Sequence, residues 1–268
     1  MNTILAMIIS GVLSLGITGL LGYGIIPWLR KLKFGQTILE EGPKWHKSKQ
    51  GTPTMGGIMF IIGIFFSAAL VLVINYITGN KLGLTGDMNT KLWAGIIMAL
   101  MFGLVGFADD YIKVVKKRNL GLSIIQKSIA QLAICAGYLT SLYLAMGKDP
   151  YMIVPFFGNI KLGFFFWILG VCVIYGAINA VNFTDGIDGL CSSVTATAAV
   201  SFIAIAVLNK FFGVGILAAA LLGGCIGFFL WNKFPAKVFM GDTGSMFLGG
   251  MVVAIAYAMD CPVILLLT

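Results

Sequence analysis

Charged residues are scarce in this chain, where they make up 10% of 268 positions against about 25% in an ordinary soluble domain. Hydrophobic residues make up 59%, and the mean hydropathy is +0.99. This composition excludes a water-soluble globular domain, because too few polar side chains are available to face water. We expect a membrane protein whose solvent is lipid.

Cysteine and histidine motifs for metal binding are also lacking. The single histidine, His46, lies in a polar stretch, where a loop role is the simpler interpretation. The five cysteines lie in or beside apolar runs without the spacing of paired metal ligands, which favours small core residues. They are Cys135, Cys172, Cys191, Cys225 and Cys261.

Long apolar runs, by contrast, are abundant. A spanning helix needs about 20 mostly apolar residues, and the first run has no basic residue before it and is too long for a secretory signal, so it predicts a retained helix. The sequence predicts an all-α polytopic fold with eight full transmembrane helices. These are Thr3–Trp28, Met55–Ile77, Leu92–Ala108, Ser123–Met146, Phe164–Ala180, Leu190–Leu208, Val214–Trp231 and Ser245–Met259.

The connections between these runs differ in charge. Thirteen of the 18 Lys and Arg residues fall in connections on one side, and five fall on the other. Under the positive-inside rule, the basic connections are cytoplasmic and the N-terminus lies outside. The formal net charge of +8 is then explained by membrane topology and anionic headgroups, so no nucleic-acid partner is expected.

Two shorter segments complete the predicted architecture. On the outer side, residues 148–161 combine Pro150, Pro155 and Gly158 with aromatics, which predicts a short ordered loop or hairpin at the interface. The last eight residues, Cys261–Thr268, are apolar but would rise only about 12 Å as a helix. We interpret them as the start of a ninth helix.

Acidic residues cluster on the predicted inner side, which holds seven of the ten. An ionisable residue near lipid is costly and tends to serve a function. The first cluster, Asp109–Asp110, ends the third run, and such a pair needs a cation or basic neighbours. Mg²⁺ characteristically takes one or two carboxylates with substrate phosphates. The alternative is a pair balanced by the following lysines at a solvated helix end.

The second cluster is Asn179–Gly189, between the fifth and sixth runs. It contains two Asp-Gly pairs, at Asp185 and Asp188, preceded by Asn179 and Asn182. These side chains suit ribose hydroxyls, a base edge or a metal. The alternative, an ordinary Asp-Gly turn, fits one such pair better than two.

The third and fourth clusters flank the eighth and second runs. Phe239–Ser245 contains Gly241 and Asp242, which suits phosphate binding at a helix N-terminus and a carboxylate ligand for a metal. A capping role for Asp242 or Thr243 is the alternative. In Lys44–Gly57, Lys49 is a candidate phosphate ligand. The alternative is that the lysines of this segment serve only as topology signals.

In this order and on one predicted side, the four clusters closely resemble those of the polyprenyl-phosphate N-acetylhexosamine-1-phosphate transferase family. The resemblance runs from Thr3 to Thr268. His46–Gly57 and Asn179–Gly189 are most similar to bacterial members whose donor is UDP-MurNAc-pentapeptide. The resemblance implies transfer of phospho-MurNAc-pentapeptide to undecaprenyl phosphate, giving lipid I and UMP with Mg²⁺, at the cytoplasmic face of a bacterial cytoplasmic membrane.

The resemblance also implies roles for particular residues. Asp109 and Asp110 correspond to the family's paired catalytic aspartates, and Asp242 to its magnesium-binding catalytic aspartate. The positions that correspond to substrate-binding residues are Lys49, Lys113, Lys117, Asn182, Asp185, Asp188, Phe239 and Gly241. Direct attack by the acceptor phosphate is expected rather than a covalent aspartyl-phosphate, because a phosphate with a second pKa of about 6 needs no dedicated base.

The sequence departs from the family pattern in one respect. The family normally has ten spanning helices and a histidine-rich loop before the last, and neither is found here. We expect residues 1–268 to form one membrane transferase domain that is truncated at its C-terminus, with the sugar-peptide side of the site incomplete. The apolar outer face of the first run permits a homodimer.

Two other functions are compatible with parts of this sequence. A sister enzyme using UDP-GlcNAc would share the paired aspartates and the metal site. A transporter predicts charged residues at mid-membrane and repeated halves; Lys127 and Gln131, one helical turn apart, are the best candidates for such charges. Lys127 can instead extend to the inner interface, and no internal repeat is evident.

Overall fold

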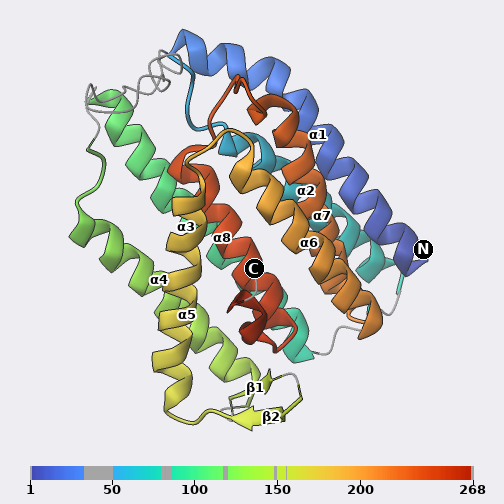
Figure 1. Ribbon diagram of the computed structural model, residues 1–268. Helices are drawn as coiled ribbons and strands as arrows, with labels where there is room; N and C mark the ends of the chain where they lie inside the picture. Colours follow the sequence, from blue (N-terminus) through green and yellow to red (C-terminus); the bar gives the residue numbers. More distant parts are fainter. Residues whose placement is uncertain are drawn as a thin grey trace.

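The computed structural model describes residues 2–32, 51–79, 82, 86–116, 120–147, 150–154 and 156–266, and it is almost entirely helical (Figure 1). Eight α-helices are described within these ranges, one for each predicted run. They are α1 Thr3–Lys31, α2 Gly57–Ile77, α3 Gly86–Val115, α4 Ile124–Ala145, α5 Phe165–Thr184, α6 Leu190–Leu208, α7 Phe212–Asn232 and α8 Gly241–Ala258.

Seven of these helices, α1 to α7, are long and apolar enough to cross a membrane. The all-α, multi-pass fold class is thereby confirmed. Helix α8 has 18 residues and a polar first turn. Every residue of α8 from Thr243 to Ala258 is buried, so its surroundings are other helices and not lipid.

Helix α8 is the centre of the bundle (Figure 1). It packs most extensively against α3, and also contacts α2, α5, α6 and α7. Glycine allows the close approach to α3: a Cβ at Gly106 would overlap the backbone of Asp242, and one at Gly250 would press on Ala99. In lipid no hydrophobic driving force brings helices together, so the close van der Waals packing that small residues allow stabilises the contact.

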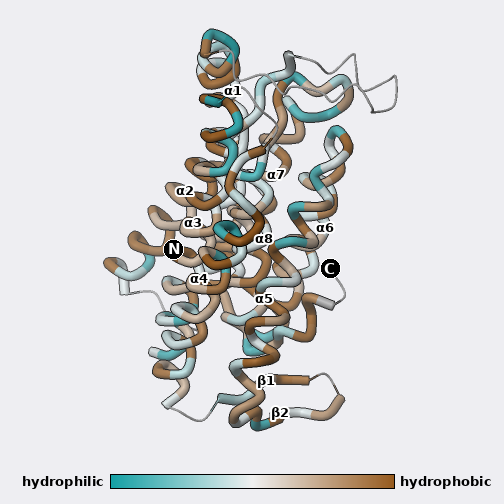
Figure 2. The backbone as a smooth tube through the Cα atoms, turned by 90° about the vertical axis from the view of Figure 1, so that its left-hand side faces the viewer, coloured by the Kyte–Doolittle hydropathy of each residue, from teal (hydrophilic) through white to brown (hydrophobic). Residues whose placement is uncertain are grey.

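The two ends of the bundle differ. At one end, the described parts of the connections α1–α2, α3–α4, α5–α6 and α7–α8 meet, and this end carries the hydrophilic C-terminal turn of α1 (Figure 2). At the other end, β1 Tyr151–Val154 and β2 Gly158–Lys161 form an antiparallel hairpin, as the sequence predicts. A 3₁₀ helix, Pro262–Leu266, packs beside this hairpin where the start of a ninth helix was expected.

Three predicted helix ends were wrong in a way that matters for the site. Helix α3 continues past Ala108 to Val115, α5 continues past Ala180 to Thr184, and α8 begins at Gly241 instead of Ser245. Hydropathy marks only the apolar part of a helix, and here each helix extends one or two turns beyond it. The Asp109–Asp110 pair, Asn182 and Asp242 are therefore held on helices, not in loops.

Candidate active site

Asp110 binds the N-terminus of α8. Its Oδ1 accepts a hydrogen bond from the backbone N–H of Asp242 at 3.2 Å, and its Oδ2 accepts from the N–H and hydroxyl of Thr243 at 2.9 and 2.7 Å. The first N–H groups of a helix have no partner within the helix, and the N-terminus carries partial positive charge. The Asp110 carboxylate, on the neighbouring helix α3, supplies both the missing hydrogen-bond acceptors and a negative charge.

Gly241 makes this contact possible. Its φ of +71° lies in the left-handed region, and a Cβ there would overlap the Asp110 carboxylate. Only glycine combines that backbone conformation with so close an approach. Gly241, expected to serve substrate binding, thus has a clear structural role in shaping the turn into α8.

Asp109 faces the opposite way, toward the α3–α4 connection. Its Oδ1 accepts a hydrogen bond from the N–H of Leu122 at 2.8 Å, and its Oδ2 lies 2.6 Å from Nζ of Lys113. The side chain is almost completely buried. The oxygens of Asp109 are therefore fixed from two sides, next to the carboxyl group of Asp242.

Asp242 is the most heavily contacted carboxylate of the group. Its Oδ2 lies 3.0 Å from Nζ of Lys113 and 2.9 Å from Nζ of Lys127, and its Oδ1 accepts from the Asn182 amide at 3.0 Å. The same amide donates to the hydroxyl of Ser245 at 2.8 Å. Two ammonium groups favour the ionised form of Asp242.

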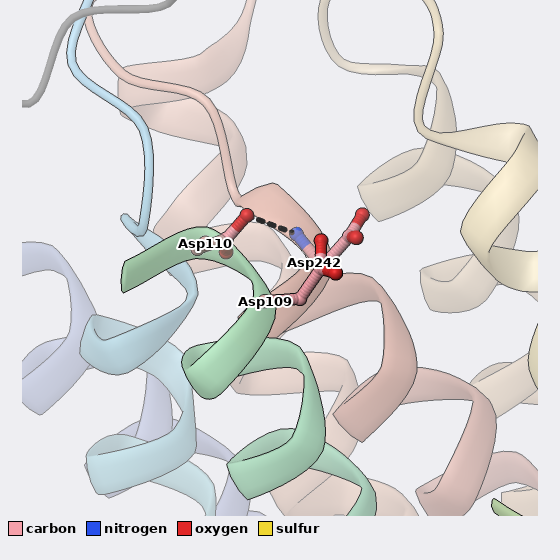
Figure 3. Close-up of side chains that lie close together, drawn as sticks. All are labelled: Asp109, Asp110 and Asp242. Atoms are coloured by element: carbon pink, nitrogen blue, oxygen red, sulfur yellow. Dashed lines mark hydrogen bonds between the residues drawn. The ribbon is translucent and has the colours of Figure 1, made fainter. Parts of the chain in front are cut away.

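The three aspartates offer a cation one compact set of oxygens. One carboxylate oxygen from each of Asp109, Asp110 and Asp242 lies within 4.8 Å of the others, and two of the three side chains are buried (Figure 3). Hard divalent cations prefer such oxygen ligands. Both oxygens of each carboxylate have contacts, but the close ones of Asp110 are all to the start of α8. Asp109 and Asp242 instead share Nζ of Lys113, a cation that a metal could replace. The donor set therefore fits a divalent cation.

The α5–α6 connection lies beside this cluster. Burial raises the pKa of the Asp185 carboxyl well above its usual value, and the nearby charges of Asp242, Asp110 and Asp188 raise it further. Asp188 accepts a hydrogen bond from the N–H of Ala236 at 3.1 Å, which ties this connection to the one before α8. Asp185 thus adds a carboxyl group to an already anionic pocket.

The fourth cluster joins the site through its backbone. The N–H of Phe239 donates to the carbonyl of Pro53, and its own carbonyl accepts from Gly56, both at 2.8 Å. A Cβ at Gly57 would overlap Gly244 of α8. The segment from Gly51 therefore lies against the start of α8. Lys49 and Lys117 fall outside the described residues.

Sequence reasoning missed Lys127 as a site residue. The sequence suggests a mid-membrane charge or a lysine that extends to the inner interface, whereas the structure places its ammonium group on Asp242. The available signal was Ser123 with Gln126: they form a capping box that begins α4, so Lys127 lies in the first turn of that helix, at the same end of the bundle as Asp242. Thr243 was expected only as a possible helix cap, and nothing local predicts its contact with Asp110 or that of Ser245 with Asn182.

Comparison with known proteins identifies the class. Residues 92–260 match the model of glycosyl transferase family 4, and residues 49–61 match signature 1 of phospho-N-acetylmuramoyl-pentapeptide-transferase. The first range includes the three aspartates and both lysines of the site.

Individual relatives give the same result. The phospho-N-acetylmuramoyl-pentapeptide-transferase of Desulforamulus reducens is 45% identical over 237 residues, covering 87% of this chain and 68% of the relative. That of Shouchella clausii is 46% identical, covering 86% and 68%. That of Desulfitobacterium hafniense is 42% identical, covering 97% and 77%. The chain therefore belongs to glycosyl transferase family 4 and, more narrowly, to the family of the phospho-N-acetylmuramoyl-pentapeptide-transferases.

Proposed function

We propose that this chain is a phosphoglycosyl transferase of peptidoglycan synthesis. It moves phospho-MurNAc-pentapeptide from UDP-MurNAc-pentapeptide to undecaprenyl phosphate. One observation carries the proposal: in a chain of this family, two lysines and three aspartates, two of them buried, meet at one end of a membrane-spanning bundle. Phosphoryl transfer needs mainly positioning and charge neutralisation, which such a group supplies.

Asp242 and Asp109 are the residues that would hold Mg²⁺. When bound, Mg²⁺ neutralises charge on the diphosphate and on the leaving phosphate of UMP. Asp110 acts differently: through its bonds to Asp242 and Thr243 it sets the start of α8, and so positions Asp242. We therefore assign Asp110 to positioning and Asp109 and Asp242 to the metal.

The lysines act on the reacting phosphates. Lys113 and Lys127 share the Asp242 carboxylate. Both ammonium groups could therefore bind a diphosphate oxygen, in addition to Asp242 or in its place. In the reaction, an oxygen of the acceptor phosphate bonds to the sugar-linked phosphorus while the bond from that phosphorus to the bridging oxygen breaks. UMP leaves with the bond's electron pair, and the acceptor needs no base because it is already largely dianionic.

The nucleotide is proposed to lie over the α5–α6 connection. Asn182, Asp185 and Asp188 present amide and carboxyl groups beside the cluster. Phe239, whose backbone N–H donates to Pro53, and Gly241 lie on the other side of the proposed nucleotide site. Lys49 and Lys117 remain proposed phosphate ligands on the strength of the sequence.

The proposed topology places this site at the cytoplasmic face of the bacterial inner membrane, with the N-terminus outside. The supporting observation is that the four connections predicted to be cytoplasmic converge at one end of the bundle (Figure 1). A homodimer through the exposed face of α1 is a further proposal.

The function is tested by UMP release from membranes that contain the full-length protein, with a defined polyprenyl phosphate acceptor. We expect Mg²⁺-dependent release from UDP-MurNAc-pentapeptide and none from UDP-GlcNAc. Preference for UDP-GlcNAc would assign the chain to the sister activity. A phosphorylated protein formed from nucleotide substrate without acceptor would contradict direct attack.

A further inference from the structure

A groove on the side of the bundle lies between α1 and α7, away from the acidic cluster. Its volume is about 370 Å³, within the range of small-molecule sites. Leu15, Leu20 and Tyr23 of α1 line one wall, and Leu230 and Trp231 of α7 line the other. Lys237, in the connection before α8, lies at its edge.

Glycines make the groove hollow. A Cβ at Gly16 would meet no atom within 4 Å, and one at Gly19 would only touch Leu230. At Gly22 a Cβ would overlap the Trp231 ring, so this glycine lets the ring lie directly on α1. The result is an apolar groove with the indole ring of Trp231 at one end.

The charged end of the groove is fixed by hydrogen bonds. The indole N–H of Trp231 donates to the Gly19 carbonyl at 3.0 Å, and the ring of Tyr23 meets it edge-on at 4.8 Å. The backbone N–H of Lys237 donates to the Trp231 carbonyl at 2.9 Å. Nζ of Lys237 lies 5.3 Å from the indole centroid. Trp, Tyr and Lys are the side chains that favour the membrane interface.

The position along α1 matches the interface. Tyr23 lies seven residues before Arg30, about 10 Å along the helix axis. Trp231 is the second-last residue of α7 and Lys237 lies in the connection that follows, so headgroup level is at Tyr23, Trp231 and Lys237, and Arg30 and Lys31 extend beyond it. Leu15, eight residues before Tyr23, lies about 12 Å deeper along α1. The groove thus runs from the headgroup region into the hydrocarbon.

We propose that this groove, defined by the α1 and α7 residues above, is a binding site for an anionic phospholipid. One acyl chain lies along Leu15, Leu20 and Leu230, and the phosphate lies on Lys237. Lipid tails contact apolar protein surfaces with little preference, so selection must come from charge. Among the described residues, Lys237 has no carboxylate partner, and its ammonium group is exposed. A single headgroup anion complements it.

The test counts phospholipids retained by the full chain in native mass spectrometry. Detergent solutions contain phosphatidylglycerol or phosphatidylcholine at equal concentration. One basic residue near anionic lipid corresponds to a preference of about fivefold, which we expect for phosphatidylglycerol. Equal retention of the two lipids would overturn the proposal.

Three variants locate the site. Lys237→Gln should abolish the preference, while Lys233→Gln, an exposed lysine of the same connection, should keep it. Gly16→Leu fills the groove and should remove one retained phosphatidylglycerol per chain; its thermal unfolding is compared with that of the native chain. An undiminished preference of Lys237→Gln for phosphatidylglycerol would contradict the proposal. Displacement of phosphatidylglycerol by a lower concentration of undecaprenyl phosphate would assign the groove to the acceptor instead.

Discussion

Buried charges gather at both ends of this bundle, and the two groups behave differently. At the end that carries the hairpin, which is the outer end in the proposed topology, Nζ of Lys91 lies 2.6 Å from Asp260 and 3.3 Å from Asp87. Tyr151 of the hairpin donates its hydroxyl to Asp260 at 3.3 Å. Lys91 is 0% exposed. This group joins α3, the end of α8 and the hairpin, with one central cation satisfied by two carboxylates.

The inner group has the same charge balance, one more carboxylate than lysine, but it differs in exposure. Three aspartates share two lysines, and Lys113, Lys127 and Asp242 all keep part of their side chains exposed. Removing one partner from a closed group leaves a buried charge uncompensated, whereas an open group can exchange a lysine contact for a cation or a substrate. The same helices, α3 and α8, thus carry a structural ion pair at one end and a reactive cluster at the other.

The largest effect should come from Asp242→Asn. This change removes a charge from the open group while Asn182 and Asp110 continue to hold the start of α8. We expect a loss of about 10³-fold in UMP release with the fold retained. Asp87→Asn, in the outer group, is the control and should keep activity within about twofold. Near-normal turnover of Asp242→Asn would remove the basis of the comparison.

Lys91→Met should produce the reverse pattern. Asp260 is left partly buried without its cation, so we expect a destabilisation of about 3 kcal/mol. The measurement is thermal unfolding in detergent followed by circular dichroism. Adding Asp260→Asn should restore part of the loss, and the activity per folded molecule should stay close to that of the native chain. Loss of activity without loss of stability would contradict a purely structural role.

The two lysines of the inner group allow a finer test. Lys127→Gln removes one of the two cations on Asp242, and we expect a decrease of about 10- to 100-fold in UMP release. Lys127→Arg should retain more activity because it keeps the charge. Lys116→Gln, an exposed lysine at the end of α3, is the matched control. Equal rates for the glutamine variants at 127 and 116 would exclude Lys127 from the site.

The smallest effect concerns Asp185. Its pKa is raised in the folded protein by burial and by neighbouring carboxylates, so its stabilising contribution is present at low pH and is lost as pH rises through the folded pKa. Asp185→Asn should therefore raise the melting temperature by about 2–4 °C at neutral pH. Unfolding curves at several pH values should show the gain shrinking on acidification. A gain independent of pH would argue against this origin.

Several features of the fold and the site were predictable from local sequence. Apolar runs located all eight helices, because a membrane requires continuous apolar stretches. The paired aspartates and Asp242 were recognisable because charge near lipid is rare. Helix ends were not predictable at Val115 or Thr184, since polar turns can continue a helix once it leaves the hydrocarbon.

The chain's own order of residues determined a polytopic helical protein with four acidic or basic clusters on one side, because lipid enforces hydropathy and charge placement residue by residue. Only the tertiary structure decided how those clusters divide their roles. Asp110 binds a helix N-terminus, Lys127 joins Asp242, and Lys91 is sealed with Asp260, three contacts between residues far apart in sequence. Such pairings depend on how α3, α4 and α8 pack, and no local pattern specifies that packing.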